Sequence, residues 1–451
     1  MDRRDSADER DAVDGPGATA ASGATDERGA SDGPGVMDEP GVVDGPGATD
    51  GPGVMDGPGA TDGPGAADRR DSASAGPLPG RPSAAVSAPA RVAAPAEGIS
   101  HEELALAARN HGLPLEALRY DVTPPGLHYV LVHYDIPATD AGTWTLAVHG
   151  RVRTPLTLDL AALHALPRVT HRVTMECAGN GRARLTPRPV SQPWLVEAVG
   201  TADWTGVPLR LLLAEAGVEP DAVEAVFTGA DHGVERGVEQ DYRRGLPLAD
   251  ATAADPEVLV AYEMNGAPLP PQHGHPLRLV VPGWYGMAHV KWLHDITLTD
   301  TPFTGFQQAV AYRFRQSPDE PGDPVTRIAP RALMIPPGFP DFMSRTRVVR
   351  PGPVRLEGRA WSGRAPVTKV EVSTDDGASW EAAELAPPDG GPWAWRHWHA
   401  PWTAAPGHHV LTARATDAEG SAQPLTQPWN RGGFGNNEVQ RIPVVCLVGS
   451  P

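Results

Sequence analysis

One cysteine has a setting that suits chemistry, because it lies between an apolar run and a glycine-rich turn. The stretch Val173-Thr-Met-Glu-Cys-Ala-Gly-Asn-Gly-Arg182 contains Cys177, and the sequence has one other cysteine, Cys446. Glycine and asparagine permit backbone angles that other residues resist, so we expect a strand that ends in a turn carrying the thiol. Arg182 could then keep the sulfur as a thiolate or attract an anion. The alternative is a buried thiol that packs as a small hydrophobe.

The composition limits the classes of protein to consider. The 451 residues predict two or three domains, and a net charge of −18 without a dense basic stripe argues against a nucleic-acid partner. We find no apolar run of about 18 residues, so no membrane span is predicted. Arg3-Arg4 is not followed by an apolar segment and does not resemble a secretory or twin-arginine signal. A cytoplasmic location is therefore predicted, and two distant cysteines are compatible with a reducing compartment.

Residues 1–97 contain a six-residue repeat that does not favour a packed fold. Asp-Gly-Pro-Gly begins at Asp44, Asp50, Asp56 and Asp62, and an Ala/Pro/Ser-rich stretch follows. Pro and Gly at this density prevent helices and strand ladders, and little apolar surface offsets the chain entropy. We predict a disordered tail and linker over residues 1–97.

The rest of the chain divides into two patterns, which together predict an α+β protein. Residues 98–325 alternate short helices and strands and indicate one mixed α/β domain, which begins with a capping box at Ser100-His-Glu-Glu103 and a helix through Asn110. Residues 326–451 alternate apolar and polar side chains at period two, which is typical of an immunoglobulin-like β-sandwich with Cys446 in its core. Further helices are expected at 157–163 and 207–216, and strands at 129–137, 143–149, 223–228, 258–262, 277–282, 354–361, 367–373 and 408–416.

The cysteine segment resembles a known metal-binding motif. Cys177-Ala-Gly-Asn-Gly-Arg182 is similar to the molybdenum-ligating segment of the sulfite oxidase family, and the resemblance continues from about residue 98 to near the C-terminus. It implies that the Cys177 thiolate binds a molybdenum already bound by molybdopterin, for which a soft thiolate is a suitable ligand. The family places a molybdenum domain before an immunoglobulin-like dimerisation domain, so a homodimer is implied. We find no segment for a further haem or flavin domain.

The resemblance also implies residues that bind the cofactor. Pro270–Arg278 and Pro282–Trp292 resemble the pterin-binding stretch of the family, with His273, Arg278 and Lys291 as ligands. Molybdopterin ends in a phosphate, which Arg278 and Lys291 suit. Without the resemblance, His273 would be interpreted as a loop residue and Lys291 as a solvated charge. His133 and Asp231 correspond to further cofactor contacts, whereas His275 and His289 are expected to be ordinary.

Four more positions correspond to the family's substrate pocket, namely Arg182, Trp194, Tyr312 and Arg431. Two guanidinium groups beside a metal would fix the orientation of an oxyanion, because each is always charged and donates in a fixed geometry. Leu131 stands where the family usually has an arginine, which removes one positive charge from the expected site.

The resemblance implies an oxidoreductase that converts sulfite into sulfate by oxygen-atom transfer and passes electrons to an external acceptor. Leu131 favours an alternative in which the same cofactor serves another substrate, such as a sulfoxide, an N-oxide or another sulfur compound. A non-catalytic interaction protein without a bound metal is the alternative from another class. We find no Gly-x-Ser-x-Gly, His-Glu-x-x-His or Walker motif.

Overall fold

The structure, a computed structural model, describes residues 91–448. Most of the predicted tail, residues 1–90, lies outside the described part. Residues 91–97 differ from the predicted linker: Val92 pairs with Pro189 in an isolated bridge, and the backbone N–H of Ala93 donates to the carbonyl of Arg188 at 2.8 Å. Ala93 is buried there. Residues 91–97 therefore contact the rest of the described chain through a short apolar segment.

The α-helices of the described chain follow the signals expected at their ends. Ser100 accepts from the backbone of Glu103, and the Glu103 carboxylate accepts from the backbone of Ser100, which confirms the predicted capping box. The third helix ends at Gly217 with φ of 67°, as its sequence predicts. The bounds are α1 (His101–Arg109), α2 (Leu160–Ala165), α3 (Leu209–Ala216) and α4 (Leu248–Ala251). Short turns are η1 (Leu115–Arg119), η2 (Pro125–Leu127), η3 (Arg182–Arg184), η4 (Pro271–His273), η5 (Gly286–Ala288) and a π-helix, η6 (Gln307–Ala311).

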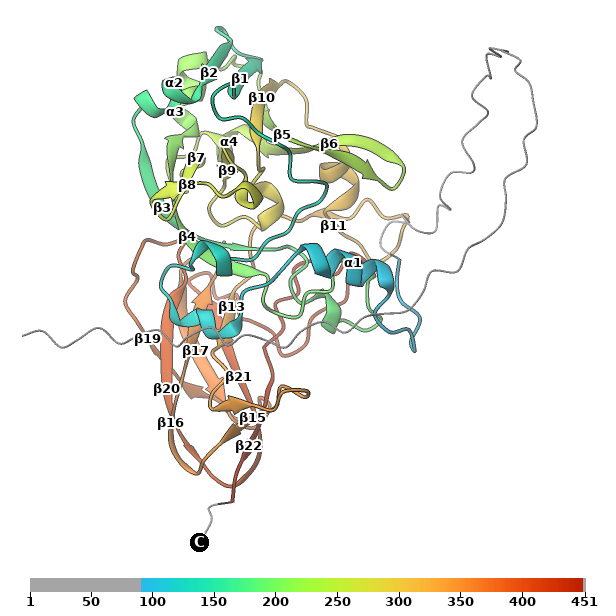
Figure 1. Cartoon of the computed structure of the whole chain (residues 1–451), viewed down its shortest axis with the longest axis vertical. Helices are drawn as coiled ribbons and strands as arrows, with labels where there is room; N and C mark the ends of the chain where they lie inside the picture. The colour runs from blue at the N-terminus through green and yellow to red at the C-terminus, as the bar shows by residue number, and fades with distance from the viewer. Residues whose placement is uncertain (1–90, 449–451) are drawn as a thin grey trace, which may run out of the picture. The chain divides into compact units, whose positions relative to one another are not determined.

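The part of the chain that contains the cysteine segment has two main sheets (Figure 1). The first has the order β2 (Leu156–Asp159), β1 (Thr145–Gly150), β10 (Leu293–Thr299), β5 (Glu224–Glu235) and β6 (Val238–Pro247). The second has the order β3 (Val169–Glu176), β4 (Val199–Pro208), β7 (Leu259–Met264) and β8 (Ala267–Pro268), with β9 (Arg278–Val280) also paired to β7. β1 and β10 run parallel, and the other pairs in these sheets are antiparallel.

Two sequence expectations for this region were wrong in detail. Residues 129–137 form no strand beyond an isolated bridge of Val130, since the backbone N–H of Val132 donates to the Asn110 side chain instead of to a strand. The predicted helix 157–163 begins only at Leu160, because the preceding residues form β2 and Asp159 caps the helix.

The C-terminal part is a β-sandwich, which completes the predicted α+β class (Figure 1). One sheet contains β13 (Arg331–Met334), β16 (Gly352–Trp361), β20 (Arg396–Ala404) and β19 (Glu384–Leu385) in that order. The other contains β14 (Phe339–Pro340), β15 (Arg347–Val349), β22 (Ile442–Cys446), β21 (Gly407–Asp417), β17 (Val367–Ser373) and β18 (Glu381–Ala382). A separate pair joins β11 (Arg313–Phe314) and β12 (Asp323–Pro324).

Side chains of both sandwich sheets form one core. Trp398 of β20 and Leu411 of β21 are fully buried in it, and Cys446 is 2% exposed, which confirms Cys446 as a core residue. The immunoglobulin-like topology and the domain boundary at residue 325 stay predictions. Within residues 91–448, no helix combines the length and the apolar character needed to cross a membrane.

Candidate active site

Cys177 follows directly on strand β3, as its sequence predicts. The last four residues of β3 are buried, and Cys177 itself is 6% exposed. The backbone N–H of Asn180 donates to the Cys177 carbonyl at 2.9 Å, and Gly181 has a φ of 87° that a side chain would disfavour. Burial raises the pKa of the Cys177 thiol, and the charge of Arg182 opposes that rise. The thiol therefore requires a positive partner, such as a metal, to stay deprotonated.

The turn after Cys177 is fixed from behind by a buried carboxylate. Glu176 is 1% exposed and lies 2.8 Å from Nε of Arg331, which is equally buried. The same carboxylate accepts from Nε1 of Trp361 at 2.8 Å and from Nδ2 of Asn180 at 3.0 Å. Arg331 and Trp361 belong to β13 and β16, so the sandwich contributes directly to the position of the cysteine turn. We did not predict this network, because nothing in the sequence pairs Glu176 with residues more than 150 positions away.

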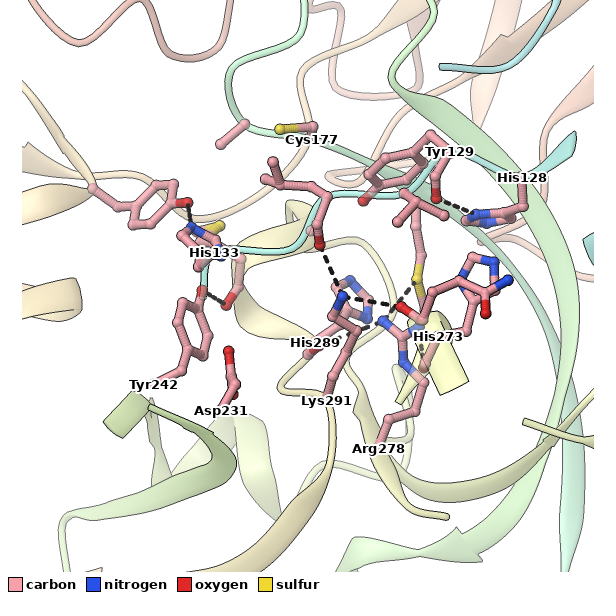
Figure 2. A pocket seen from close by; sticks show the side chains of 18 residues that line it. His128, Tyr129, His133, Cys177, Asp231, Tyr242, His273, Arg278, His289 and Lys291 are labelled. Carbon is pink, nitrogen blue, oxygen red and sulfur yellow. Dashed lines mark hydrogen bonds between the residues drawn. The ribbon is translucent and has the colours of Figure 1, made fainter. Parts of the chain in front are cut away.

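Cys177 lies at the junction of two cavities. The inner cavity has a volume of about 50 Å³, and the outer cavity has a volume of about 550 Å³. They share Leu131, His133, Cys177 and Tyr312. The remaining inner-cavity residues include His128, Tyr129, Asp231, Tyr242, His273, Arg278, His289 and Lys291 (Figure 2).

Two buried cations line the inner cavity. Arg278 donates to the carbonyl of His273 at 3.0 Å and lies over the Trp204 ring, and burial lowers its pKa to about 10. Lys291 donates to the carbonyls of Leu131 at 2.8 Å and Gln272 at 3.0 Å (Figure 2). Neither makes an ion pair within 4 Å among the described residues. The charge of Arg278, and that of Lys291 in its protonated form, is thus available to an anionic ligand.

Lys291 should also make the stability of the cofactor-free protein depend on pH. Burial, the largest cause, lowers the pKa of Lys291 from 10.5 to about 7. Between these values the unfolded chain binds a proton that the folded chain does not, so the free energy of unfolding rises with pH. We expect the Tm of the wild type to increase relative to that of Lys291→Met from pH 7 to pH 10. Lys369→Met, at a side chain 54% exposed, is the control and should show no such trend; the same trend in both variants would contradict this assignment.

The predicted histidines lie at the inner cavity with their rings neutral at neutral pH. Burial lowers the pKa of His273 to about 2 and that of His133 to about 3. Nε2 of His133 lies 2.7 Å from the hydroxyl oxygen of Tyr312 (Figure 2). Burial also raises the pKa of Tyr312, so its hydroxyl remains protonated. The pair therefore offers neutral hydrogen-bonding groups beside Cys177.

The sequence predicted some of the other cavity residues and missed others. Asp231 is 4% exposed with one carboxylate oxygen that lacks a partner, and burial raises its pKa to about 6. His289 was expected to be ordinary, and both of its ring nitrogens are bound to backbone groups of Val281 and Trp284. His128, with an unpartnered buried Nε2, was missed, because a lone histidine in a loop carries no sequence signal.

The outer cavity contains the remaining predicted residues. Arg182, Trp194 and Arg431 line it together with Tyr312. Arg182 is 6% exposed, donates to the carbonyls of Gly432 at 2.9 Å and Gln192 at 3.3 Å, and lies over the Phe434 ring. Within residues 91–448, the buried indole nitrogen of Trp194 has no hydrogen-bond partner at standard geometry. The structure thus brings every predicted site residue to one of two adjoining cavities.

Comparisons with known proteins agree with this geometry. Residues 133–307 match the family model described as oxidoreductase molybdopterin binding domain, and residues 340–446 match the model described as Mo-co oxidoreductase dimerisation domain. The chain is 34% identical over 341 residues to human mitochondrial sulfite oxidase, covering 72% of this chain and 61% of that protein. It is 34% identical over 328 residues to chicken sulfite oxidase, covering 68% of this chain and 70% of that protein.

Two further comparisons concern a nitrate reductase sequence and a solved structure of the same fold. A nitrate reductase of Phytophthora infestans is 30% identical over 364 residues, covering 73% of this chain and 40% of that protein. The crystal structure of the sulfane dehydrogenase SoxCD from Paracoccus pantotrophus has the same fold, with a TM-score of 0.65 at 24% identity over 79% of this chain and 94% of that chain. The chain spans 61% of the length of the first mammalian relatives it matches.

The family matches define the class of this chain, which contains the two domains of molybdopterin-binding oxidoreductases. The cysteine turn lies within the first matched range, and Trp361 of the second range donates to the neighbouring Glu176. The chain belongs to the sulfite oxidase family.

The side chains around the inner cavity are chemically suited to the molybdenum–molybdopterin cofactor that this family binds. Three buried polar atoms have no hydrogen-bond partner within the described chain, namely Nε2 of His128, Nε of Arg278 and Oδ1 of Asp231. Buried polar atoms are normally hydrogen-bonded, so these three are available to a ligand. The thiol of Cys177 is the soft donor that a sulfur-bound metal prefers. Arg278 and Lys291 supply charge for a terminal phosphate. Donors and charges thus match the two ends of the cofactor.

Proposed function

We propose that this protein oxidises sulfite to sulfate and passes the electrons to an external one-electron acceptor. The observation that supports this proposal is the position of Cys177, whose thiol lies between a buried cationic cavity and an arginine-lined one. When bound, the molybdenum cofactor supplies two-electron oxygen-atom transfer. The protein supplies binding, orientation and charge.

We assign separate roles to the residues of the two cavities. Cys177 binds molybdenum, and the inner-cavity ligands of molybdopterin are His133, Asp231, His273, Arg278 and Lys291. In the outer cavity, Arg182 and Arg431 orient the substrate anion, and Trp194 forms part of the wall. Tyr312 donates a hydrogen bond from a hydroxyl that stays protonated at neutral pH. Each role follows from charge or hydrogen-bonding capacity at the stated position.

The test is sulfite-dependent reduction of ferricyanide by purified protein whose molybdenum content has been measured. Turnover in proportion to the molybdenum content is expected. Full molybdenum content without sulfite turnover would overturn the sulfite proposal but leave the cofactor assignment. Protein that carries no molybdenum after expression in a host that makes the cofactor would instead favour the non-catalytic interaction protein.

The assembly and location are also proposals. We propose a homodimer, supported by the match of residues 340–446 to a dimerisation-domain model. Light scattering coupled to gel filtration should give about twice the 47.5 kDa mass of the chain. The cytoplasmic location stays a prediction, since the mammalian relatives are mitochondrial by name.

A further inference from the structure

The outer cavity is larger than sulfite requires. Its volume is about 550 Å³, within the range of about 300–1,000 Å³ for sites that bind drug-sized ligands. Sulfite has four non-hydrogen atoms and fills roughly the volume of two water molecules, or about 60 Å³. Most of the outer cavity would therefore remain solvent around a sulfite ion.

The charge of the outer cavity selects an anion. Five arginines line it, namely Arg182, Arg236, Arg313, Arg315 and Arg431, and Glu235 is the one carboxylate among the lining residues. Glu235 is already engaged, because it accepts from Gln307 at 2.8 Å and lies 3.8 Å from Arg236.

Within residues 91–448, the other four arginines of this set form no ion pair within 4 Å. Arg313 donates to the carbonyl of Pro321 at 3.0 Å, and Arg315 donates to the carbonyl of Ala309 at 3.1 Å. A carbonyl accepts a hydrogen bond without cancelling a charge. Neutral sulfoxides and N-oxides would gain little from such a surface, whereas an anion would gain from several guanidinium groups at once.

The same cavity has apolar walls that a bare oxyanion would not use. Leu131, Val132, Val190, Val310 and Phe434 line it. Leu131 lies where the two cavities meet, and its backbone is fixed by the hydrogen bond that its carbonyl accepts from Lys291. Val310 on the π-helix is 38% exposed at the cavity wall. An apolar substituent on the substrate would cover this surface and gain about 25 cal/mol for each Å² removed from water.

We propose that the outer cavity binds organic sulfinates, R–SO₂⁻, and that the enzyme oxidises them to sulfonates, R–SO₃⁻. This inference rests on the proposed oxygen-atom-transfer function and specifies its substrate class. In the net reaction, a sulfinate and one water give a sulfonate, two protons and two electrons. A new S–O bond forms at the sulfur lone pair, the oxygen derives from water, and two equivalents of the external one-electron acceptor are reduced. Arg182 faces the anionic head, and the Leu131 side of the cavity faces R.

The test compares kcat/KM of the molybdenum-loaded enzyme for benzenesulfinate, methanesulfinate and sulfite, with ferricyanide as acceptor. We expect benzenesulfinate to exceed methanesulfinate at least tenfold. Leu131→Arg should lower the ratio of kcat/KM for benzenesulfinate to kcat/KM for sulfite at least tenfold. Val223→Arg is the control, because it adds the same charge at a residue that is 44% exposed and lines neither cavity. It should leave kcat/KM unchanged for both benzenesulfinate and sulfite.

A binding measurement separates the ligand site from turnover. Benzenesulfonate and sulfate are reaction products that the enzyme cannot oxidise further, so their binding can be measured without turnover. Calorimetric titration of the loaded enzyme should show that benzenesulfonate binds at least tenfold more tightly than sulfate. Equal affinities would overturn the inference. Sulfite turnover without sulfinate turnover would overturn it and leave the proposed function intact. Sulfinate turnover without sulfite turnover would support the inference and overturn the sulfite proposal. Turnover of neither substrate at full molybdenum content would overturn both the inference and the sulfite proposal.

Discussion

Cys177→Ser should abolish turnover of every substrate while the fold is kept. Serine is close in volume to cysteine, so the buried turn after β3 can retain its hydrogen bonds. A serine hydroxyl is a hard donor that stays protonated, whereas the metal requires a soft thiolate. The loss should exceed about 100-fold, because loss of a group that only supports a metal ligand already costs 10- to 100-fold. The measurement is kcat per bound molybdenum for sulfite and for benzenesulfinate.

The second cysteine provides the matched control. Cys446 is buried in the sandwich core, and Cys446→Ser makes the same atomic change far from both cavities. It should lower the free energy of unfolding by about 1–3 kcal/mol, since a hydroxyl is more costly to bury in an apolar core than a thiol. Turnover per molybdenum should stay unchanged. Equal losses of turnover in both variants would show that the effect of Cys177→Ser is structural.

Local signals predicted much of the fold. The capping box at Ser100 and the glycine at Gly217 each specify a helix end by hydrogen bonds between near neighbours, and both were confirmed. Alternation of apolar and polar residues at period two predicted the strands of the sandwich, because each strand presents one face to the core. Residues 129–137 show the limit of such reasoning: their apolar side chains line a ligand cavity instead of a sheet, and periodicity cannot distinguish the two.

The sequence predicted only those residues of the candidate site that belong to recognisable motifs. Cys177, Arg278 and Lys291 stand in recognisable stretches, and the structure places them around one cavity. Arg313 on β11 and Arg315 just after it give the outer cavity much of its charge, and neither belongs to a motif. Their contribution depends on tertiary neighbours, as does that of the Glu176–Arg331 pair. Interactions of this kind appear only once the chain has folded.

The Glu176–Arg331 pair should be among the most sensitive positions for stability. Both side chains are 1% exposed, and their atoms Oε1 and Nε lie 2.8 Å apart. Removal of one partner leaves a buried charge uncompensated, which costs about 3–5 kcal/mol. We therefore expect Glu176→Gln and Arg331→Met each to lower the free energy of unfolding by about that amount, measured by urea denaturation.

The double variant tests whether the cost comes from the unpaired charge. Glu176→Gln with Arg331→Met removes both charges and should cost clearly less than the sum of the single variants, because neither charge remains buried alone. Glu371→Gln, in a partly exposed pair with Arg414 at 2.8 Å, is the control and should cost about 1 kcal/mol or less. Strict additivity in the double variant would mean that the two residues act independently. Because Cys177 directly follows Glu176, the single variants should also bind less molybdenum, and an unchanged metal content would mean that the cysteine turn is fixed without this contact from the sandwich.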